Sequence, residues 1–141
     1  MTSNTLIPVR LDSRFRLKEL LGTGSFGMFF IIEFNYPCKL ILQMSRSNVY
    51  RTVNIITNQL YAIKLKLTME GRSSVEREYY ILKELVNIAG LPRPRWFGRE
   101  SNFDTLVIDL LGPSLYQLLQ QHQKFSVPTV AYLANQLVRF C

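Results

Sequence analysis

Three short stretches of the chain are predicted to be β-strands, and in the first two of them apolar and polar residues alternate, as in half-buried strands. These stretches cover residues 15–21, 59–66 and 103–109. In the middle stretch, the period of two places Ala62 and Lys64 on the same face of the strand. The pattern therefore predicts a sheet that carries a small residue and a lysine side by side.

Helical spacing of apolar residues appears between the second and the third predicted strand. A Ser-x-x-Glu capping box at residues 73–76 precedes it, and the pattern predicts a helix over residues 74–88. Glu78 shares the apolar face of this helix, where an unpaired carboxylate would be costly to bury, so Lys64 is its expected partner. A solvated position at the edge of the stripe is the alternative for this glutamate. The apolar stripe consists of Val75, Tyr79, Leu82 and Val86.

Two further helices are predicted near the end of the chain. A Gly-Pro turn follows the third strand, and a second capping box predicts a helix over residues 114–121. Ser126 begins another helix, which has an apolar stripe at helical spacing: Val130, Leu133, Leu137 and Phe140. Such a stripe on a monomer favours a protein partner that covers residues 126–141.

The composition indicates one domain core and limits the classes of partner. With 141 residues, 48% of them hydrophobic, the chain can bury one core. Its formal net charge of +7 comes from scattered basic residues, so we expect a solvated basic surface and no nucleic-acid partner. Two cysteines make no disulfide framework, and no signal peptide or apolar run of about 18 residues occurs. We therefore expect a soluble protein of the cytoplasm or nucleus, without a membrane partner.

A glycine motif follows the first predicted strand. Residues 21–27 read Leu-Gly-Thr-Gly-Ser-Phe-Gly, and their glycines allow backbone amides to approach phosphate groups closely. The spacing alone is a weak signal, because dinucleotide-binding folds share it. Those folds continue directly into a helix, whereas residues 28–32 form an apolar, β-prone run. A glycine loop between strands, followed by Tyr-Ala-Ile-Lys at residues 61–64, favours a protein kinase.

In the order and spacing of these motifs, residues 15–141 resemble the casein kinase I family of serine/threonine protein kinases. The glycine motif, the lysine strand, a glutamate fourteen residues after Lys64 and the segment 91–98 resemble parts of this family. The most specific stretch is Leu-Leu-Gly-Pro-Ser-Leu at residues 110–115, which resembles the family's hinge. The segment 129–137 resembles the start of its helix E.

The resemblance implies an α+β fold of the protein-kinase type. It predicts a twisted antiparallel sheet with helix C in an N-lobe over residues 15–109, after a tail at residues 1–14. A hinge at residues 110–113 and the first helices of a truncated C-lobe, helix D and part of helix E, follow at residues 114–141.

The resemblance also implies a binding site for ATP. The backbone of the glycine loop would lie over the phosphates, and Lys64, held by Glu78, would contact the α- and β-phosphates. The expected cofactor-binding residues are Leu21, Gly22, Gly24, Ser25, Phe26, Gly27, Val49, Ala62, Lys64, Glu78, Ile108, Asp109 and Leu111. Simple burial in the core is the alternative for the apolar members of this set.

The same resemblance assigns the residues around the adenine. Ala62 and Leu21 would border the ring, and Ile108 would be the gatekeeper behind it. The backbone of Asp109 and Leu111 would hydrogen-bond the adenine edge.

Residues 29–48 interrupt the resemblance. Phe29 stands where the loop of a kinase has a valine under the adenine, and removal of residues 29–48 brings Val49 to that place. We interpret this segment as a twenty-residue insertion that arises from a retained intron or a gene-model error. The alternative is a long loop over residues 33–56 between two strands, a length that is uncommon in compact domains.

The motifs that hold metal and orient the substrate do not occur in the chain. Neither His-Arg-Asp nor Asp-Phe-Gly is present, and His122, the only histidine, has a polar setting. Asp104 and Asp109 stand at a strand start and at the hinge, so they are not substitutes. We therefore expect no catalytic residue and no ligand for Mg²⁺, which complete family members use with ATP.

Two functions remain open at this point. The first is the ATP-binding portion of a casein-kinase-I-like kinase that does not itself transfer phosphate. The second is a non-catalytic remnant that binds nucleotide weakly or acts as a protein-interaction module.

Overall fold

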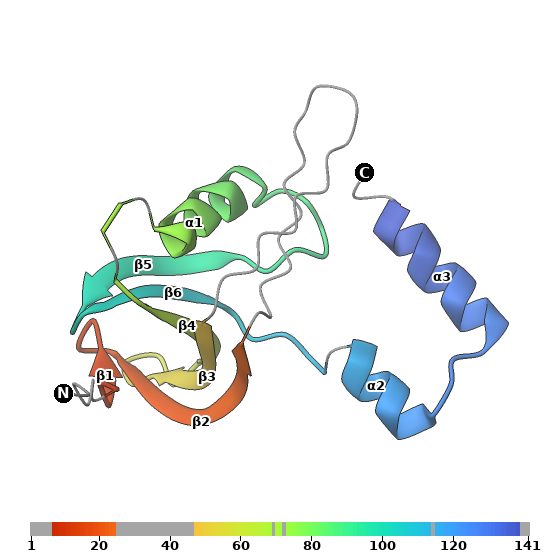
Figure 1. The fold of residues 1–141 in the computed structure, drawn as a ribbon, viewed down its shortest axis with the longest axis horizontal. Helices are drawn as coiled ribbons and strands as arrows, with labels where there is room; N and C mark the ends of the chain where they lie inside the picture. Colours follow the sequence, from red (N-terminus) through yellow and green to blue (C-terminus); the bar gives the residue numbers. More distant parts are fainter. Residues whose placement is uncertain (1–6, 25–46, 69, 72, 114, 139–141) are drawn as a thin grey trace. The chain divides into compact units, whose positions relative to one another are not determined.

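The computed structural model describes residues 7–24, 47–68, 70–71, 73–113 and 115–138. These residues form, in chain order, β1 (Arg10–Leu11), β2 (Phe15–Gly24), β3 (Ser47–Asn54), β4 (Leu60–Leu67), α1 (Ser74–Glu84), β5 (Pro94–Glu100), β6 (Phe103–Asp109), α2 (Leu115–His122) and α3 (Val127–Val138) (Figure 1). The chain divides into two units, of which one carries the sheet with α1 and the other carries α2 and α3.

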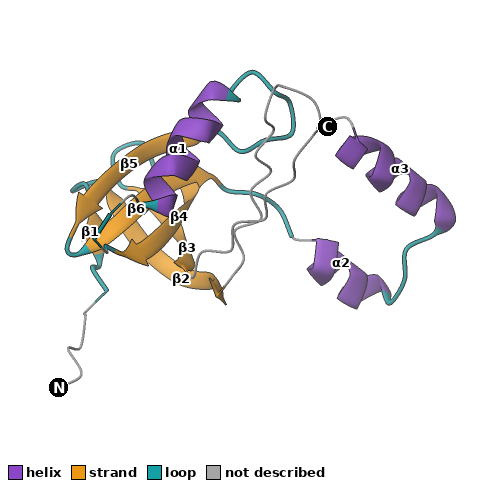
Figure 2. Ribbon diagram, turned by 45° about the horizontal axis from the view of Figure 1, so that its top comes forward, coloured by secondary structure: helices purple, strands orange, loops and turns teal. Residues whose placement is uncertain are grey.

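All neighbouring strands of the sheet are antiparallel. The six strands follow the order β1-β2-β3-β4-β6-β5, and Figure 2 shows α1 lying against the sheet. The mixed class with an antiparallel sheet and a helix, predicted as α+β, is therefore confirmed. The sheet begins with β1, inside the segment that the sequence indicated to be a tail.

The register between the strands decides which side chains share a face. Lys64 lies opposite Val49 on β3 and opposite Leu106 on β6, while Ala62 lies opposite Ile108. Because opposed residues of antiparallel strands point to the same side, these five side chains occupy one face. Helix α1 covers part of this face, where an apolar cluster joins the two elements: Val75, Tyr79, Leu82, Phe97, Leu106 and Ile108.

The main core lies on the opposite face of the sheet. It consists of Leu11, Phe15, Ile63, Leu65, Phe103 and Val107. Trp96 contacts this cluster, and its ring centroid lies 5.9 Å from that of Phe15. Residues from the start of β2 thus pack against a residue of β5, although several strands separate them in the sheet order.

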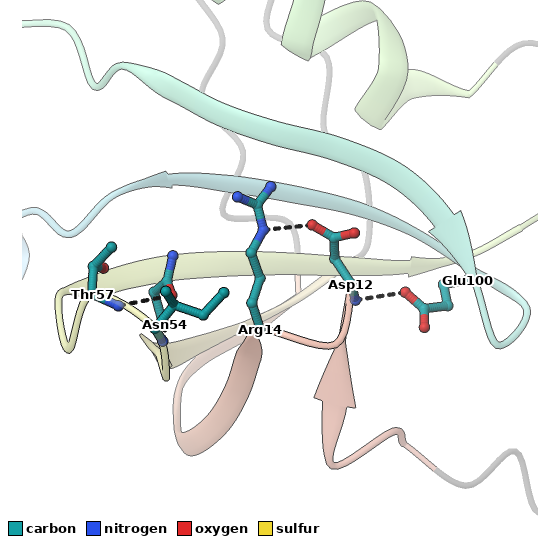
Figure 3. A network of polar contacts seen from close by, with 6 residues as sticks. Asp12, Arg14, Asn54, Thr57 and Glu100 are labelled. Atoms are coloured by element: carbon teal, nitrogen blue, oxygen red, sulfur yellow. Dashed lines mark hydrogen bonds and ion pairs between the residues drawn. The ribbon is translucent and has the colours of Figure 1, made fainter.

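Polar contacts near the β1–β2 turn join the two edges of the sheet. The Asp12 backbone N–H donates to the Glu100 carboxylate at 2.7 Å, and Arg14 forms an ion pair of 2.6 Å with Asp12 (Figure 3). On the neighbouring β3–β4 turn, the Asn54 side-chain carbonyl accepts from the Thr57 backbone N–H. Since β1 and β5 are the first and last strands of the order, the Asp12–Glu100 contact requires a strongly curled sheet.

Helix α1 begins as predicted and ends earlier. The Ser73 hydroxyl accepts from the Glu76 backbone N–H at 3.3 Å, as an N-cap does. The predicted end at residue 88 is wrong, because Leu85 leaves the helical conformation with φ −92° and ψ 11°. Val86 therefore lies beyond the helix and is exposed, whereas Val75 and Leu82 of the stripe are buried.

The second unit contains the two C-terminal helices. The bounds of α2 agree with the prediction within one residue, and α3 begins directly after Ser126, whose hydroxyl accepts from the Thr129 N–H. Several large apolar side chains of α3 are exposed: Val127, Val130, Tyr132 and Val138. Among the described residues, no helix combines the length and the hydropathy that a bilayer span requires.

The hypothesised insertion falls mostly outside the described residues. Its last two residues, Ser47 and Asn48, belong to β3, where they pair with Gly24 and Thr23 of β2. Residues 29–46, and with them the choice between an insertion and a long loop, lie outside the part of the chain that the structure describes.

Candidate functional site

The structure brings Lys64 and Glu78 together in a buried ion pair. Lys64 comes from the middle of β4 and Glu78 from the second turn of α1, and the distance between Nζ and Oε2 is 2.8 Å. Their side chains are only 4% and 3% exposed. The pair arises because Lys64 points to the face that α1 covers, while Glu78 lies on the helix stripe that faces the sheet.

Burial dominates the electrostatics of this pair. Loss of solvent raises the pKa of Glu78 from 4.5 to about 7, although the charge and the hydrogen bond of Lys64 act in the opposite direction. A buried ion pair is often no more stable than apolar residues of the same volume, so stability alone is a weak reason for its presence. Carboxylates with strongly shifted pKa values gather at functional sites, which makes this pair the centre of the candidate site.

Small and apolar residues lie beside the ion pair on the same sheet face. Ala62 is buried and stands two positions before Lys64 on β4, while Val49 lies directly opposite Lys64 on β3. Gly22 of β2 is in turn opposite Val49. Hence Gly22, Val49 and Lys64 form a row across three adjacent strands.

The glycine at position 22 is not required by packing in the structure. A Cβ atom added to Gly22 would meet no atom within 4 Å, and the residue does not have a positive φ. Open space above a strand is what a ligand that approaches the backbone would need. Gly24 lies in β2 as well, whereas Ser25, Phe26 and Gly27 lie outside the described residues.

The remaining predicted site residues lie in the last part of β6, shortly after it, and in β2. Ile108 is half-buried, lies opposite Ala62 and contacts the apolar cluster under α1. Leu21 and Leu111 are exposed. The Asp109 backbone N–H donates to the Arg93 carbonyl at 3.1 Å, so this N–H is not available to a ligand.

The sequence did not reveal that the Asp109 carboxylate is held by Arg95 of β5 and by Arg93, the residue before this strand. The carboxylate accepts from the Arg93 backbone N–H at 3.1 Å and from Arg95 Nε at 2.7 Å. This contact fixes the end of β6, where the predicted hinge begins. The signal in the sequence is the alternating Arg-Pro-Arg at residues 93–95, but its partner strand becomes known only from the fold.

A second polar cluster joins the N-terminal end of α1 to the sheet. Arg99 forms ion pairs with Glu76 at 3.1 Å and with Asp104 at 3.0 Å, and Lys66 donates to the Ser74 hydroxyl at 2.7 Å. Asp104 is only 2% exposed and is paired with Arg99, so its role is structural. In the described part of the chain, no three His, Cys, Asp or Glu residues are grouped as metal ligands would be.

Comparison with known proteins relates this geometry to a family. No protein-family model matches the chain. Over 125 residues, it is 35% identical to casein kinase I homolog 2 of Schizosaccharomyces pombe. The resemblance to casein kinase I is thereby confirmed. The match covers 88% of this chain and 24% of that relative, so the chain spans about a quarter of the relative's length.

Proposed function

We propose that this chain is the ATP-binding portion of a casein-kinase-I-like serine/threonine protein kinase. The observation that carries the proposal is the buried Lys64–Glu78 pair, which lies beside Ala62 on one sheet face. In this proposal the sheet is the N-lobe and α1 is helix C. The similarity to casein kinase I homolog 2 supports the assignment.

The ion pair would act as a positioning device for phosphate. Glu78 keeps the Lys64 ammonium at a fixed place on β4, so the cation need not lose conformational freedom when an anion arrives. The row of Gly22, Val49 and Lys64 leaves open space above Gly22 for the phosphates, beside an apolar surface for the base. Bound ATP would supply the phosphoryl group that complete family members transfer.

The base would lie between β4 and the residues after β6. Ala62 gives room above the ring, Ile108 lies behind it, and Leu21 and Leu111 are exposed apolar side chains at the border. The Asp109 carbonyl would accept a hydrogen bond from the adenine amino group and the Leu111 N–H would donate one. The ion pair of Asp109 with Arg95 supports this role because it holds the strand end in place.

We further propose that residues 1–141 bind ATP without transferring its phosphoryl group. They contain no His-Arg-Asp or Asp-Phe-Gly motif, so the orienting aspartate and the Mg²⁺ ligands of complete kinases have no counterpart in these residues. The exposed apolar side chains of α3 favour a second role as a surface for a protein partner.

Titration with a fluorescent ATP analogue tests the nucleotide site. Lys64→Met removes the proposed phosphate contact, and we expect the dissociation constant to rise by about tenfold or more. Lys66→Met is the matched control, because this lysine lies on the same strand and face but contacts Ser74 at the start of α1. We expect its affinity to stay within about twofold of the original chain.

Folding of both variants is verified by far-ultraviolet circular dichroism. Equal affinity of the original chain and a folded Lys64→Met variant would refute the proposed site. Equal weakening by both lysine variants would show that only the general positive charge attracts the nucleotide.

A further inference from the structure

Strands β1 and β2 place two arginines directly opposite each other at one edge of the sheet. Arg10 and Arg16 are paired across the strands, and both side chains are exposed. The next pair, Leu11 and Phe15, is buried in the core, so the two arginines share the outer face. Lys18 adds a third exposed cation two residues further along β2.

Opposed residues of antiparallel strands form either hydrogen-bonded or non-hydrogen-bonded pairs, and the two arginines form a pair of the second kind. The Leu17 backbone N–H donates to the Val9 carbonyl at 3.1 Å, which makes Val9 and Leu17 a hydrogen-bonded pair. The neighbouring pair, Arg10 and Arg16, is then of the non-hydrogen-bonded kind, in which the side chains lie closer together. Like charges in such a position destabilise the sheet.

Nothing in the described part of the chain neutralises these charges. The ion pairs and side-chain hydrogen bonds of the described residues involve other basic residues: Arg14, Arg51, Lys64, Lys66, Arg95 and Arg99. A close pair of arginines that forms no ion pair with a described residue is an arrangement that an external anion stabilises.

The backbone of β1 gives this surface a second recognition feature. β1 is the terminal strand of the sheet, and a residue in a non-hydrogen-bonded pair directs its N–H and C=O away from its partner strand. Arg10 therefore directs both groups to the outer edge of β1, two residues before Asp12, whose N–H donates to Glu100. An extended peptide can add at this edge as a further strand. Three exposed cations are few for a nucleic-acid backbone, but they match two or three carboxylates.

We propose that an extended, acidic segment of a partner protein docks along β1. Its backbone pairs with Arg10, and its carboxylates lie against the guanidinium groups of Arg10 and Arg16, with Lys18 at the border. This docking surface uses other residues than the nucleotide site. Both include β2, but Arg16 lies near the start of this strand and Gly22 near its end.

Fluorescence anisotropy with a labelled ten-residue peptide of alternating glutamate and valine tests the proposal. We expect saturable binding that weakens as salt rises and is absent for the same peptide with glutamine in place of glutamate. Arg10→Gln and Arg16→Gln should each weaken binding by about tenfold. Arg77→Gln, which removes the same charge from an exposed position on α1, should change the affinity by less than about twofold.

The free chain provides an independent measurement. Removal of one arginine relieves the repulsion, so Arg16→Gln should raise the midpoint of thermal unfolding at low salt, and the increase should shrink at high salt. Arg77→Gln should show no such increase. A decrease for Arg16→Gln would contradict the close like-charge pair.

Several outcomes would overturn the proposal. Equal losses of affinity in Arg77→Gln and Arg16→Gln would show that only the net charge of the chain attracts the peptide. Equal binding of the glutamine peptide would show that its apolar residues, and not its carboxylates, cause the binding. Displacement of the peptide by a single-stranded oligonucleotide at lower concentration than by unlabelled peptide would assign the surface to nucleic acid. Dimerisation of Arg10→Gln in light scattering, with unchanged peptide affinity, would show that these charges only keep copies of the chain apart.

Discussion

The Lys64–Glu78 pair predicts an unusual dependence of stability on pH. Below about pH 4.5, Glu78 is protonated in the folded and in the unfolded chain. Between 4.5 and about 7 it stays protonated when folded but ionises when unfolded, because burial raises its pKa in the folded state. The folded chain then binds more protons than the unfolded chain, so the free energy of unfolding falls as pH rises through this window. Above about pH 7, both states are ionised and the fall ends.

The size of the effect follows from the pKa change. A rise from 4.5 to about 7, at about 1.4 kcal/mol per pH unit, corresponds to a contribution of about 3 kcal/mol. Solvent screening reduces it little, because the Glu78 side chain is only 3% exposed. Glu78→Gln cannot titrate, so the stability of this variant relative to the original chain should increase by about 3 kcal/mol between pH 4.5 and 7.5.

Urea unfolding at several pH values, followed by the fluorescence of the single tryptophan, Trp96, measures this difference. The other titrating groups occur in both proteins and cancel in the comparison. Glu76→Gln is the matched control, because it removes a more exposed carboxylate from the same helix. Parallel stability curves for Glu78→Gln and the original chain would refute the argument, since the carboxyl would then have the same pKa in both states.

Three further predictions concern the rest of the chain. Asp109→Asn weakens the contact with Arg95, which is partly exposed, so we expect a loss of about 1 kcal/mol in urea unfolding; an unchanged midpoint would show that the contact does not hold β6. Gly98→Ala should destabilise the chain by about 1–3 kcal/mol and shift the Trp96 emission, because the added Cβ would lie 2.3 Å from the indole ring. An unchanged stability would mean that the ring moves away without cost. The exposed apolar residues of α3 predict concentration-dependent association at ~10 µM and above in light scattering, which Val130→Lys should reduce; a clean monomer would show that the apolar stripe is covered within the chain.

Local patterns in the sequence were sufficient for the elements that hold the ion pair. The period of two identified the strand and put Ala62 and Lys64 on one face, because alternation of side chains is a property of the extended backbone itself. Helical spacing in the same way put Glu78 on the apolar stripe of α1. The partner was then deducible from charge, since a carboxylate on a buried face requires a cation.

The C-terminal end of α1 shows where local patterns become unreliable. The apolar spacing continued to Val86, but the helix ends at Glu84. Helix ends depend on which apolar residues the sheet can cover, and residues beyond Leu85 are mostly exposed. The sequence shows where the apolar stripe of α1 lies, but the length of the sheet surface that covers this stripe is known only from the structure.

Contacts between distant strands required the tertiary structure. Only the register places Val49 opposite Lys64, Arg95 within reach of Asp109 and Arg10 opposite Arg16. The contact between Asp12 and Glu100 joins residues 88 positions apart and depends on the curl of the whole sheet. Periodicity fixes the face on which a side chain lies, because that choice is local; its neighbour on the next strand depends on how the strands pair, which the packing of the complete core decides.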